Sequence, residues 1–347
     1  MEAHARAVRR RACAWVSAHR DRFALGEDAL APDGQVNSSW KPLGELAQVC
    51  ASVLAHTAPP DPTHARAGDL LAFAWRQTGH GELFVRLQQC EPFATYPLEV
   101  YGAFAAAGLR RPEYERAAAT VARARGWRLT EQDPTRRLGV LTAERRAGIH
   151  RPEHDSPTLE RTWLGGLAEP WTFERFSGYA LTHVVFHLTD WGRTPDALPA
   201  DLATYLTHWL PPWLDTCLDA GMWDLGCELL AVAATLPGPT DPPDPPVTAD
   251  AWHRISSAQH ASGALPEERP SPADPQDADD EPGFTHCYHS TLMAAFAAAL
   301  TLGRRHLHRA GHGRGDGEER DLTGAWHAEP AAGPGPRTRY DGQGALG

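Results

Sequence analysis

The stretch "WDLGCELLAVAATL", residues 223 to 236, is apolar on almost every side of the helix that its spacing predicts. A helix of this kind must be surrounded by protein, whereas an amphipathic helix can face water on one side. The segments before and after it, residues 198–221 and 248–260, are amphipathic. We therefore expect an inner helix that lies between two outer helices.

The same alternation continues through the second half of the chain. Residues 177–192, "SGYALTHVVFHLTDWG", and residues 287–300, "CYHSTLMAAFAAAL", are two more apolar segments that suit inner helices. Nothing in the chain alternates with the period of two that a half-buried strand shows. The sequence therefore predicts an all-α fold, an α/α barrel or toroid of helical hairpins whose inner helices begin near residues 178, 224 and 285.

Capping and proline signals place the ends of these helices. Ser177 is the expected N-cap of the first inner helix. Pro211 and Pro212 are expected to kink or divide the amphipathic segment 198–221, because proline removes a helical hydrogen bond.

Composition divides the chain into three parts. We expect an N-terminal helical half over residues 1–150, a C-terminal helical half over 151–308 that carries the candidate site, and a disordered tail over 309–347. An acidic loop over residues 262–283 interrupts the second half with seven acids, one arginine and five prolines, which predicts a mobile segment.

The bulk chemistry excludes several classes of function. The net charge is −11 and no basic stripe dominates, which argues against a nucleic-acid partner. No apolar run approaches the roughly 20 residues of a membrane helix. Six scattered cysteines without a CxxC pair, and no export signal after the N-terminal arginines, favour reduced thiols in a cytoplasmic protein. The single lysine and the many Arg, Ala, Pro and Gly suggest an actinobacterial-type genome.

The first candidate cluster lies in "THVVFHLTD". His183, His187 and Asp190 follow one helical stripe, and two imidazoles one turn apart are a common metal grip. We predict His183 as a metal ligand and His187 and Asp190 as catalytic residues. The alternative is a set of polar contacts on a half-buried helix.

The second cluster lies in "WDLGCELL". Asp224, Cys227 and Glu228 fall in the first turns of the predicted helix, where its positive end favours a thiolate. We predict Asp224 and Cys227 as metal ligands. The alternative is a capping aspartate and a cysteine that packs as a small apolar residue.

The third cluster is "HCYH", residues 286 to 289. Helical geometry places His286 and His289 on the side that Met293 and Phe296 continue, so His289 is expected to face the interior. We predict His289 as a metal ligand, with a buried, hydrogen-bonded histidine as the alternative.

All three clusters fall early in predicted inner helices. Since the inner helices of an α/α barrel run in the same direction, their N-terminal ends would meet around one mouth of the barrel. Three protein ligands with one open position form the usual catalytic metal site.

The segments around the third cluster resemble protein prenyltransferase β-subunits and related terpene-cyclase barrels. In that family a Gln and Gly end an outer helix, and a loop leads to an inner helix that opens with a Tyr-His-Thr motif. Here Gln259 and Gly263 precede Tyr288-His289-Ser290. The resemblance covers about residues 223 to 303 and implies that His289 binds zinc.

The family also uses an Asp-x-Cys pair on the preceding inner helix. Asp224 and Cys227 stand one residue further apart, so the resemblance supports Cys227 more than Asp224. "DADD", Asp277 to Asp280, matches the acid motif of metal-free terpene cyclases, but it lies among prolines and acids that should keep it hydrated.

These patterns predict a metal-dependent enzyme, with Zn²⁺ as the expected ion. We expect it to act on a small molecule or modified peptide by transfer or cyclisation chemistry, in specialised metabolism. A helical-repeat binding or scaffold protein is one alternative. A redox enzyme with iron or copper held by His and Asp is another, and the oligomeric state is not predicted.

Overall fold

The computed structural model describes residues 1–27, 29–30, 39–150, 158–236, 246–269 and 282–312. Every regular element in these ranges is a helix, so the predicted all-α fold class is confirmed. The Asp277–Asp280 motif and nearly all of the predicted tail lie outside the described residues.

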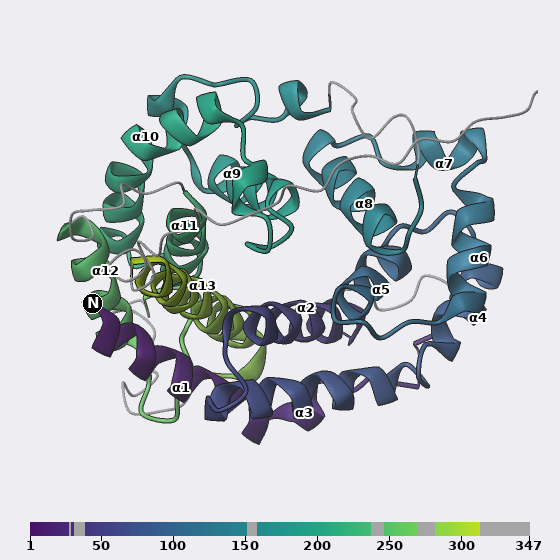
Figure 1. The fold of residues 1–347 in the computed structure, drawn as a ribbon, viewed down its shortest axis with the longest axis horizontal. Coiled ribbons are helices and arrows are strands. Elements are labelled where there is room, and N and C mark those ends of the chain that lie inside the picture. Colours follow the sequence, from purple (N-terminus) through teal and green to yellow (C-terminus); the bar gives the residue numbers. More distant parts are fainter. Residues whose placement is uncertain (28, 31–38, 151–157, 237–245, 270–281, 313–347) are drawn as a thin grey trace, which may run out of the picture.

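Six of the described helices lie side by side around a ring (Figure 1). In the order of contact, α13 packs on α2, α2 on α5, α5 on α8, α8 on α9, α9 on α11, and α11 again on α13. The bounds of these ring helices are α2 Lys41–His56, α5 Tyr96–Ala106, α8 Pro134–Arg146, α9 Arg175–Leu188, α11 Trp223–Thr235 and α13 Tyr288–His312.

The remaining α-helices lie outside the ring (Figure 1). α1 packs on α13, α3 on α2, α4 on α5, and α10 on α11. Their bounds are α1 Glu2–Ala18, α3 Pro62–Gln77, α4 Glu82–Cys90, α6 Pro112–Val121, α7 Arg125–Thr130, α10 Ala200–Asp219 and α12 Pro246–Ala258. Short 3₁₀ helices are η1 Arg20–Phe23, η4 Leu159–Arg161, η5 Pro170–Thr172, η6 Pro195–Ala197 and η7 Phe284–His286.

Neighbouring ring helices run parallel. Tyr179 contacts Asp224 and Thr182 contacts Glu228, so contacts advance in the same direction along α9 and α11. The same advance relates α2 to α13 (Glu45 with His289, His56 with Gly303) and α5 to α8 (Glu99 with Arg136, Gly102 with Ala143). The N-terminal ends of these helices therefore gather at one end of the ring.

Small residues let the ring helices approach closely. Five alanines in the middle of α13, from Ala294 to Ala299 with Phe296 among them, are fully buried. A Cβ atom at Gly178 of α9 would lie 2.8 Å from Leu225 Cδ2 of α11, so a larger residue there would push the two helices apart. This close packing fixes the positions of the side chains at the helix N-termini.

The structure corrects two predictions about the helices, the N-cap of α9 and a division of the segment 198–221. Glu174 is the N-cap of α9, and Ser177 is the third helical residue that completes a capping box with it, so the prediction of Ser177 as N-cap is wrong. Pro211 and Pro212 lie inside α10 and do not divide it.

The first part of the predicted mobile loop is packed against the ring. Ala264 and Leu265 are fully buried, and the backbone N–H of Leu265 donates to Thr291 Oγ1 at 2.8 Å. The backbone N–H of Asp224 donates to Glu267 O at 3.1 Å. The prediction of mobility is therefore wrong for residues 262–269, because apolar side chains and hydrogen bonds to the starts of α11 and α13 hold them.

A turn after α9 crosses the ring at its other end. Asp190, Trp191 and Gly192 have successive φ angles of 48°, 57° and 82°, all in the left-handed region. The carbonyl of Gly192 lies 3.1 Å from His56 Nε2 of α2, and a Cβ at Gly192 would lie 2.5 Å from Leu300 Cδ2 of α13. Glycine is required here by both the backbone and the packing.

No helix in the described ranges combines the length and the hydrophobicity that a bilayer span requires.

Replacing Phe296 with alanine should lower the free energy of unfolding by about 3–5 kcal/mol. Phe296 is fully buried, and its ring lies 5.3 Å from the rings of both Phe186 and Trp191. Urea denaturation followed by circular dichroism measures the change. Leu129→Ala is the control, because Leu129 is 68% exposed and its loss should cost about 0.5 kcal/mol or less. Equal losses in both variants would contradict the packing described here.

Candidate functional site

Two acids on α11 lie one above the other inside the ring. Asp224 and Glu228 are four residues apart, which places both on one face of the helix. Their residues are only 4% and 1% exposed. Burying a carboxylate is costly unless a partner offsets the lost hydration, so both need partners inside the protein.

His289 on the first turn of α13 faces both acids. Its Nε2 atom lies 3.5 Å from Asp224 Oδ1 and 3.4 Å from Glu228 Oε1. The ligand atoms of the three residues all lie within 4.8 Å of one another. α11 and α13 are adjacent and parallel, which is why residues near the two N-terminal ends meet.

The outer atom of each of these side chains is held by a neighbouring ring helix. Glu45 Oε2 of α2 lies 2.8 Å from His289 Nδ1. The hydroxyl of Tyr179 on α9 donates to Asp224 Oδ2 at 2.9 Å. The hydroxyl of Thr182, also on α9, donates to Glu228 Oε2. Four ring helices, α2, α9, α11 and α13, therefore contribute to one cluster.

The inner atoms of the cluster are left without such partners. Among the described residues, neither Asp224 Oδ1 nor Glu228 Oε1 accepts a hydrogen bond. His289 Nε2 carries at most one hydrogen, and both oxygens lie further from it than the usual roughly 3 Å of an N–H···O bond. A divalent cation between the three atoms would satisfy all of them at once, so the residues fit a metal.

The ionisable groups of the cluster shift one another's pKa values. Burial by itself lowers the pKa of His289, but the charges of Glu45 and Asp224 outweigh burial and raise that pKa well above its usual value. Burial raises the pKa of Asp224 to about 7, with Glu228 adding to the rise. For Glu228, burial is outweighed by the contact with His289 and the charge of His183, which lower its pKa. Without a metal, a proton on His289 therefore offsets part of the negative charge of the neighbouring acids.

His183, predicted as a ligand, lies at the edge of the cluster. Its Nε2 atom is 3.8 Å from Glu228 Oε1, and its side chain is 46% exposed. His183 therefore lies between the buried acids and the solvent.

Of the predicted catalytic residues, His187 lies one turn further along α9 and Asp190 lies in the turn that follows the helix. The imidazole of His187 is 6.4 Å from that of His183, and burial lowers its pKa well below the usual value. Asp190 Oδ1 accepts a hydrogen bond from Arg146 Nε at 2.7 Å. The structure does not bring either residue to the Asp224 cluster.

Cys227 does not join the cluster either. It is fully buried, and burial together with the charges of Asp224 and Glu228 raises the pKa of its thiol well above the usual value. A thiolate at the start of α11 was the reason to expect a metal ligand, and the two neighbouring carboxylates remove that reason.

Three supporting residues were missed from the sequence, and Glu228 was noted without being assigned as a ligand. The spacing of Asp224 and Glu228 was a usable signal, since both fall on one helix face. Glu45, Tyr179 and Thr182 carried no local signal, because their roles depend on helices that meet only in the folded chain.

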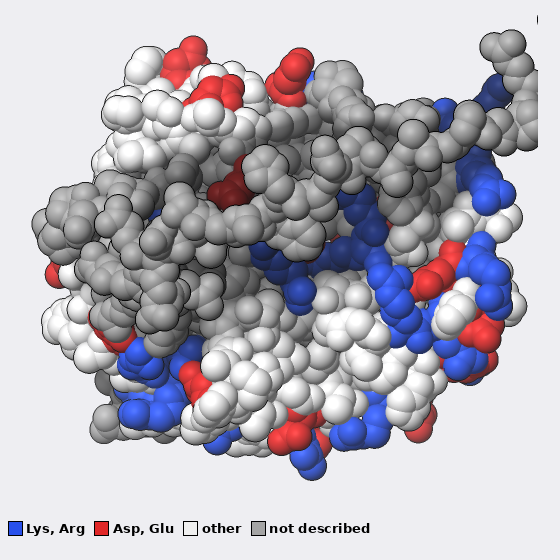
Figure 2. Space-filling model, viewed as in Figure 1, with Lys and Arg blue, Asp and Glu red and all other residues white. Residues whose placement is uncertain are grey.

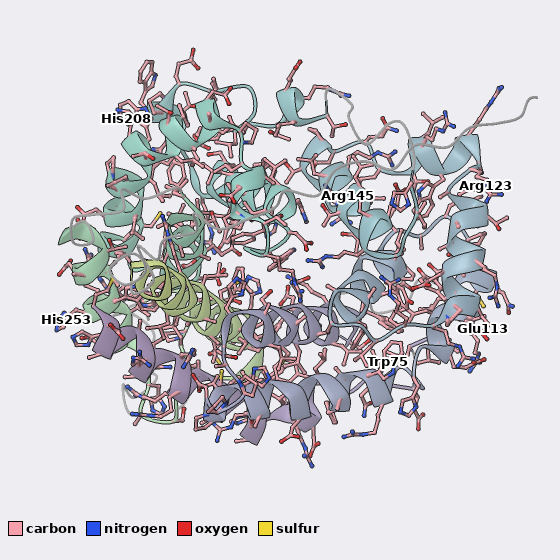
Figure 3. All side chains as sticks on the ribbon, in the orientation of Figure 1. Trp75, Glu113, Arg123, Arg145, His208 and His253 are labelled. Atoms are coloured by element: carbon pink, nitrogen blue, oxygen red, sulfur yellow. The ribbon has the colours of Figure 1, made fainter. Side chains whose placement is uncertain are left out.

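Charged side chains lie both in the middle of one face of the ring and on its outer rim (Figure 2 and Figure 3). Figure 2 shows Lys and Arg side chains set back in the middle of this face, over α2 and α8. Figure 3 places Arg145 on the ring helix α8, whereas Glu113, Arg123, His208 and His253 lie on the outer rim.

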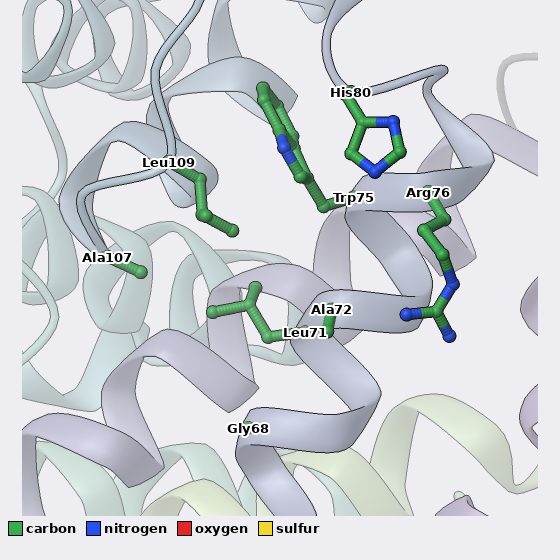
Figure 4. Close-up of a pocket in the computed structure, with 8 residues that line it drawn as sticks. All are labelled: Gly68, Leu71, Ala72, Trp75, Arg76, His80, Ala107 and Leu109. Carbon is green, nitrogen blue, oxygen red and sulfur yellow. The ribbon is translucent and has the colours of Figure 1, made fainter.

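A separate hollow lies outside the ring, beside α3. It has a volume of about 280 Å³, and Figure 4 shows Trp75, Arg76 and His80 around it together with small apolar residues. Its walls come from α3 and the turns after α3 and α5, so it is not part of the Asp224 cluster.

The comparison with known families identifies the chain. The profile of a domain of unknown function, DUF6895, matches residues 9–299, which is more than four-fifths of the 347 residues. The chain belongs to the DUF6895 family. No curated protein and no solved structure matches it. The DUF6895 region runs from α1 into α13 and contains every residue of the cluster, from Glu45 to His289.

The metal-free DUF6895 protein should lose stability as the pH rises from about 7 to about 9, above the range in which buried His187 has an opposite effect. The raised pKa of Asp224 stabilises the fold at low pH, and that contribution is lost as the pH passes about 7. The raised pKa of His289 contributes fully below the pKa of an unfolded histidine and is lost as the pH rises through the folded value. Urea denaturation in EDTA across this pH range measures the slope.

His289→Gln should flatten this pH dependence, because the variant has no imidazole to titrate. His208→Gln is the matched control, since His208 is an exposed histidine on the outer rim. If the stability of His289→Gln changed with pH as steeply as that of the unmodified protein, the raised pKa of His289 would be contradicted.

Proposed function

We propose that this DUF6895 protein is a divalent-metal-dependent enzyme that acts on a small molecule or modified peptide. Asp224, Glu228 and His289 are the metal ligands in this proposal. One observation carries it: each of the three side chains has its outer atom held by another ring helix and its inner atom directed to a common point.

The outer contacts match those that support metal ligands in general. A ligating histidine usually donates its second ring N–H to a carboxylate, which fixes the tautomer and orients the ring. Glu45 stands in that position relative to His289. Tyr179 and Thr182 hold the two carboxylates in the same manner.

The donor set narrows the choice of ion. Two carboxylate oxygens and one imidazole nitrogen suit Zn²⁺ and Fe²⁺, whereas a set rich in thiolates would favour zinc more strongly. We place Zn²⁺ first and iron second, with copper as a further alternative. Cys227 is not a ligand in this proposal, because its thiol is held in the protonated form.

In this proposal the metal and the residues around it have different roles in the reaction. A metal in such a site supplies Lewis acidity to a bound water or carbonyl group. His183 is the exposed imidazole beside the cluster, so it is placed to exchange protons with the substrate. Tyr179 and Thr182 keep the acids in position while this happens.

The resemblance to prenyltransferase β-subunits and terpene cyclases agrees with one part of this proposal, because it implies that His289 binds zinc. It also implies Cys227 as a ligand, and the proposal departs from the resemblance there by using Glu228. The ring of parallel helices is the kind of scaffold that those proteins have. Transfer or cyclisation chemistry, in specialised metabolism, is therefore the reaction class that we propose.

The cysteines favour the cytoplasm as the location of this protein. All six are free thiols, and five of them are buried. Reduced thiols are typical of cytoplasmic proteins. The net charge of −11 supports a partner other than nucleic acid.

A binding or scaffold protein is the second candidate. The observation in its favour is that a protonated His289 already neutralises part of the charge of Glu45, Asp224 and Glu228. In that case the cluster would be a structural ion network, and metal would not bind.

Metal binding separates these two functions. We expect about one Zn²⁺ or Fe²⁺ per chain by plasma mass spectrometry, and micromolar or tighter Zn²⁺ binding by calorimetry. Glu228→Gln and His289→Gln should abolish binding, whereas Cys227→Ala should retain it. Glu113→Gln is the control, because Glu113 is an exposed acid on the outer rim. If the unmodified protein binds no metal after reconstitution under reducing conditions, the enzyme proposal is wrong. The binding or scaffold function would then be the better one.

Glu45→Gln should weaken Zn²⁺ binding about 10- to 100-fold without abolishing it, since Glu45 acts through His289 rather than on the metal. Titration of the variant against a chromophoric chelator measures the affinity. An unchanged affinity would show that Glu45 does not orient His289.

A further inference from the structure

Three arginines meet below the cluster, on the side of the ring that the turn after α9 closes. Arg145 and Arg146 end α8, and Arg193 follows that turn. Arg146 Nη1 donates to Gln48 Oε1 of α2 at 2.6 Å, and Arg193 Nη2 donates to Ala51 O of α2 at 3.1 Å. These contacts draw the ends of α8 and α9 toward α2.

The donors of these arginines are not all used. The side chain of Arg146 is only 9% exposed, and its buried Nη2 atom has no hydrogen-bond partner among the described residues. Arg193 Nε is also buried, and it too lacks an acceptor in the described part of the chain. A buried donor without an acceptor costs free energy, so two such atoms on neighbouring arginines favour a ligand that accepts hydrogen bonds.

The charges of this arginine cluster are also unbalanced. Asp190 is the acid that contacts it, through Arg146 Nε, and Gln48 is neutral. Within the described ranges, three positive groups therefore share one negative group. Burial lowers the pKa of Arg146, and the charges of Arg193 and Arg145 lower it further, against the pull of Asp190.

α9 connects this arginine cluster to the metal cluster. His183, beside Glu228, lies in α9, and Asp190, beside Arg146, lies in the turn that follows the end of α9 at Leu188. His187 lies between them, and its backbone carbonyl accepts from Arg145 Nη2 at 3.4 Å. From His183 to Leu188 the helix advances about 7.5 Å, so the arginine cluster lies beyond the C-terminal end of α9.

We propose that Arg145, Arg146 and Arg193 bind an oxyanion group, a carboxylate or a phosphate. Guanidinium groups bind both kinds of group in forked geometry. That this oxyanion is part of the substrate rests on the proposed function. The substrate is then an anionic molecule whose charged group lies beyond the C-terminal end of α9, while its reacting atom lies at the metal cluster.

Anion binding is measured on the EDTA-treated protein, so that the result does not depend on metal. Inorganic phosphate and acetate are titrated separately by calorimetry at constant ionic strength, with chloride as the reference salt. We expect saturable binding of one or both anions at one site per chain. Stronger binding of phosphate would indicate a phosphorylated substrate, and stronger binding of acetate a carboxylic acid.

Arg193→Gln and Arg145→Gln should each weaken that binding by about tenfold or more. Arg123→Gln should leave it unchanged, because Arg123 is an exposed arginine on the outer rim. Arg146 is left intact, since its ion pair with Asp190 supports the fold. Circular dichroism confirms that the variants are folded.

Either of two results would overturn the proposal: no saturable binding of phosphate or acetate beyond chloride, or an equal loss in Arg123→Gln and Arg193→Gln. The metal measurement described above stands apart from this test. A protein that binds zinc but no anion would keep the proposed function and lose the oxyanion site.

Discussion

The burial of two carboxylates on one turn of α11 is the constraint on which the site depends. Asp224 and Glu228 are almost completely removed from water, and isolated charges in that position would be unstable. They are tolerated because His289 faces both, and because hydroxyl groups of α9 hold their outer oxygens. A shift of α9, α11 or α13 would separate the carboxylates from these partners and lower the stability of the fold. The packing of these helices and the chemistry of the cluster are therefore linked.

The parallel arrangement of the ring helices explains why the acids gather where they do. The N-terminal end of a helix carries a partial positive charge, which favours nearby carboxylates. α2, α9, α11 and α13 bring these ends together; Asp224 lies in the first turn of α11, and Glu45 is the fifth residue of α2. The other end of the ring carries the arginine cluster and the turn from Asp190 to Gly192. The Asp224 cluster and the arginine cluster therefore lie toward opposite ends of the ring.

Close packing in α13 makes this arrangement possible. Its alanines let α1, α2 and α11 approach on three sides, and Phe296 fills the space toward α9. The strained turn after α9 then reaches α2 and α13 across the ring. Backbone strain of this kind persists only where the surrounding structure enforces it, and it is common near functional sites.

Local patterns in the sequence determined the helical class and the apolar character of α9, α11 and α13, and they singled out Asp224, His183 and His289 as candidate ligands. These follow from helical periodicity and from residue types that are costly to bury, both of which a single segment displays. Tertiary structure alone decided which atoms meet. Glu45 contacts His289 across 244 residues, and Arg146 contacts Gln48 across 98, distances over which no local pattern carries information. Cys227 was chosen over Glu228 because a thiol near a helix start suggests a thiolate. Only the fold shows that Glu228 faces His289, while Cys227 is buried where burial and the two carboxylates raise the pKa of its thiol.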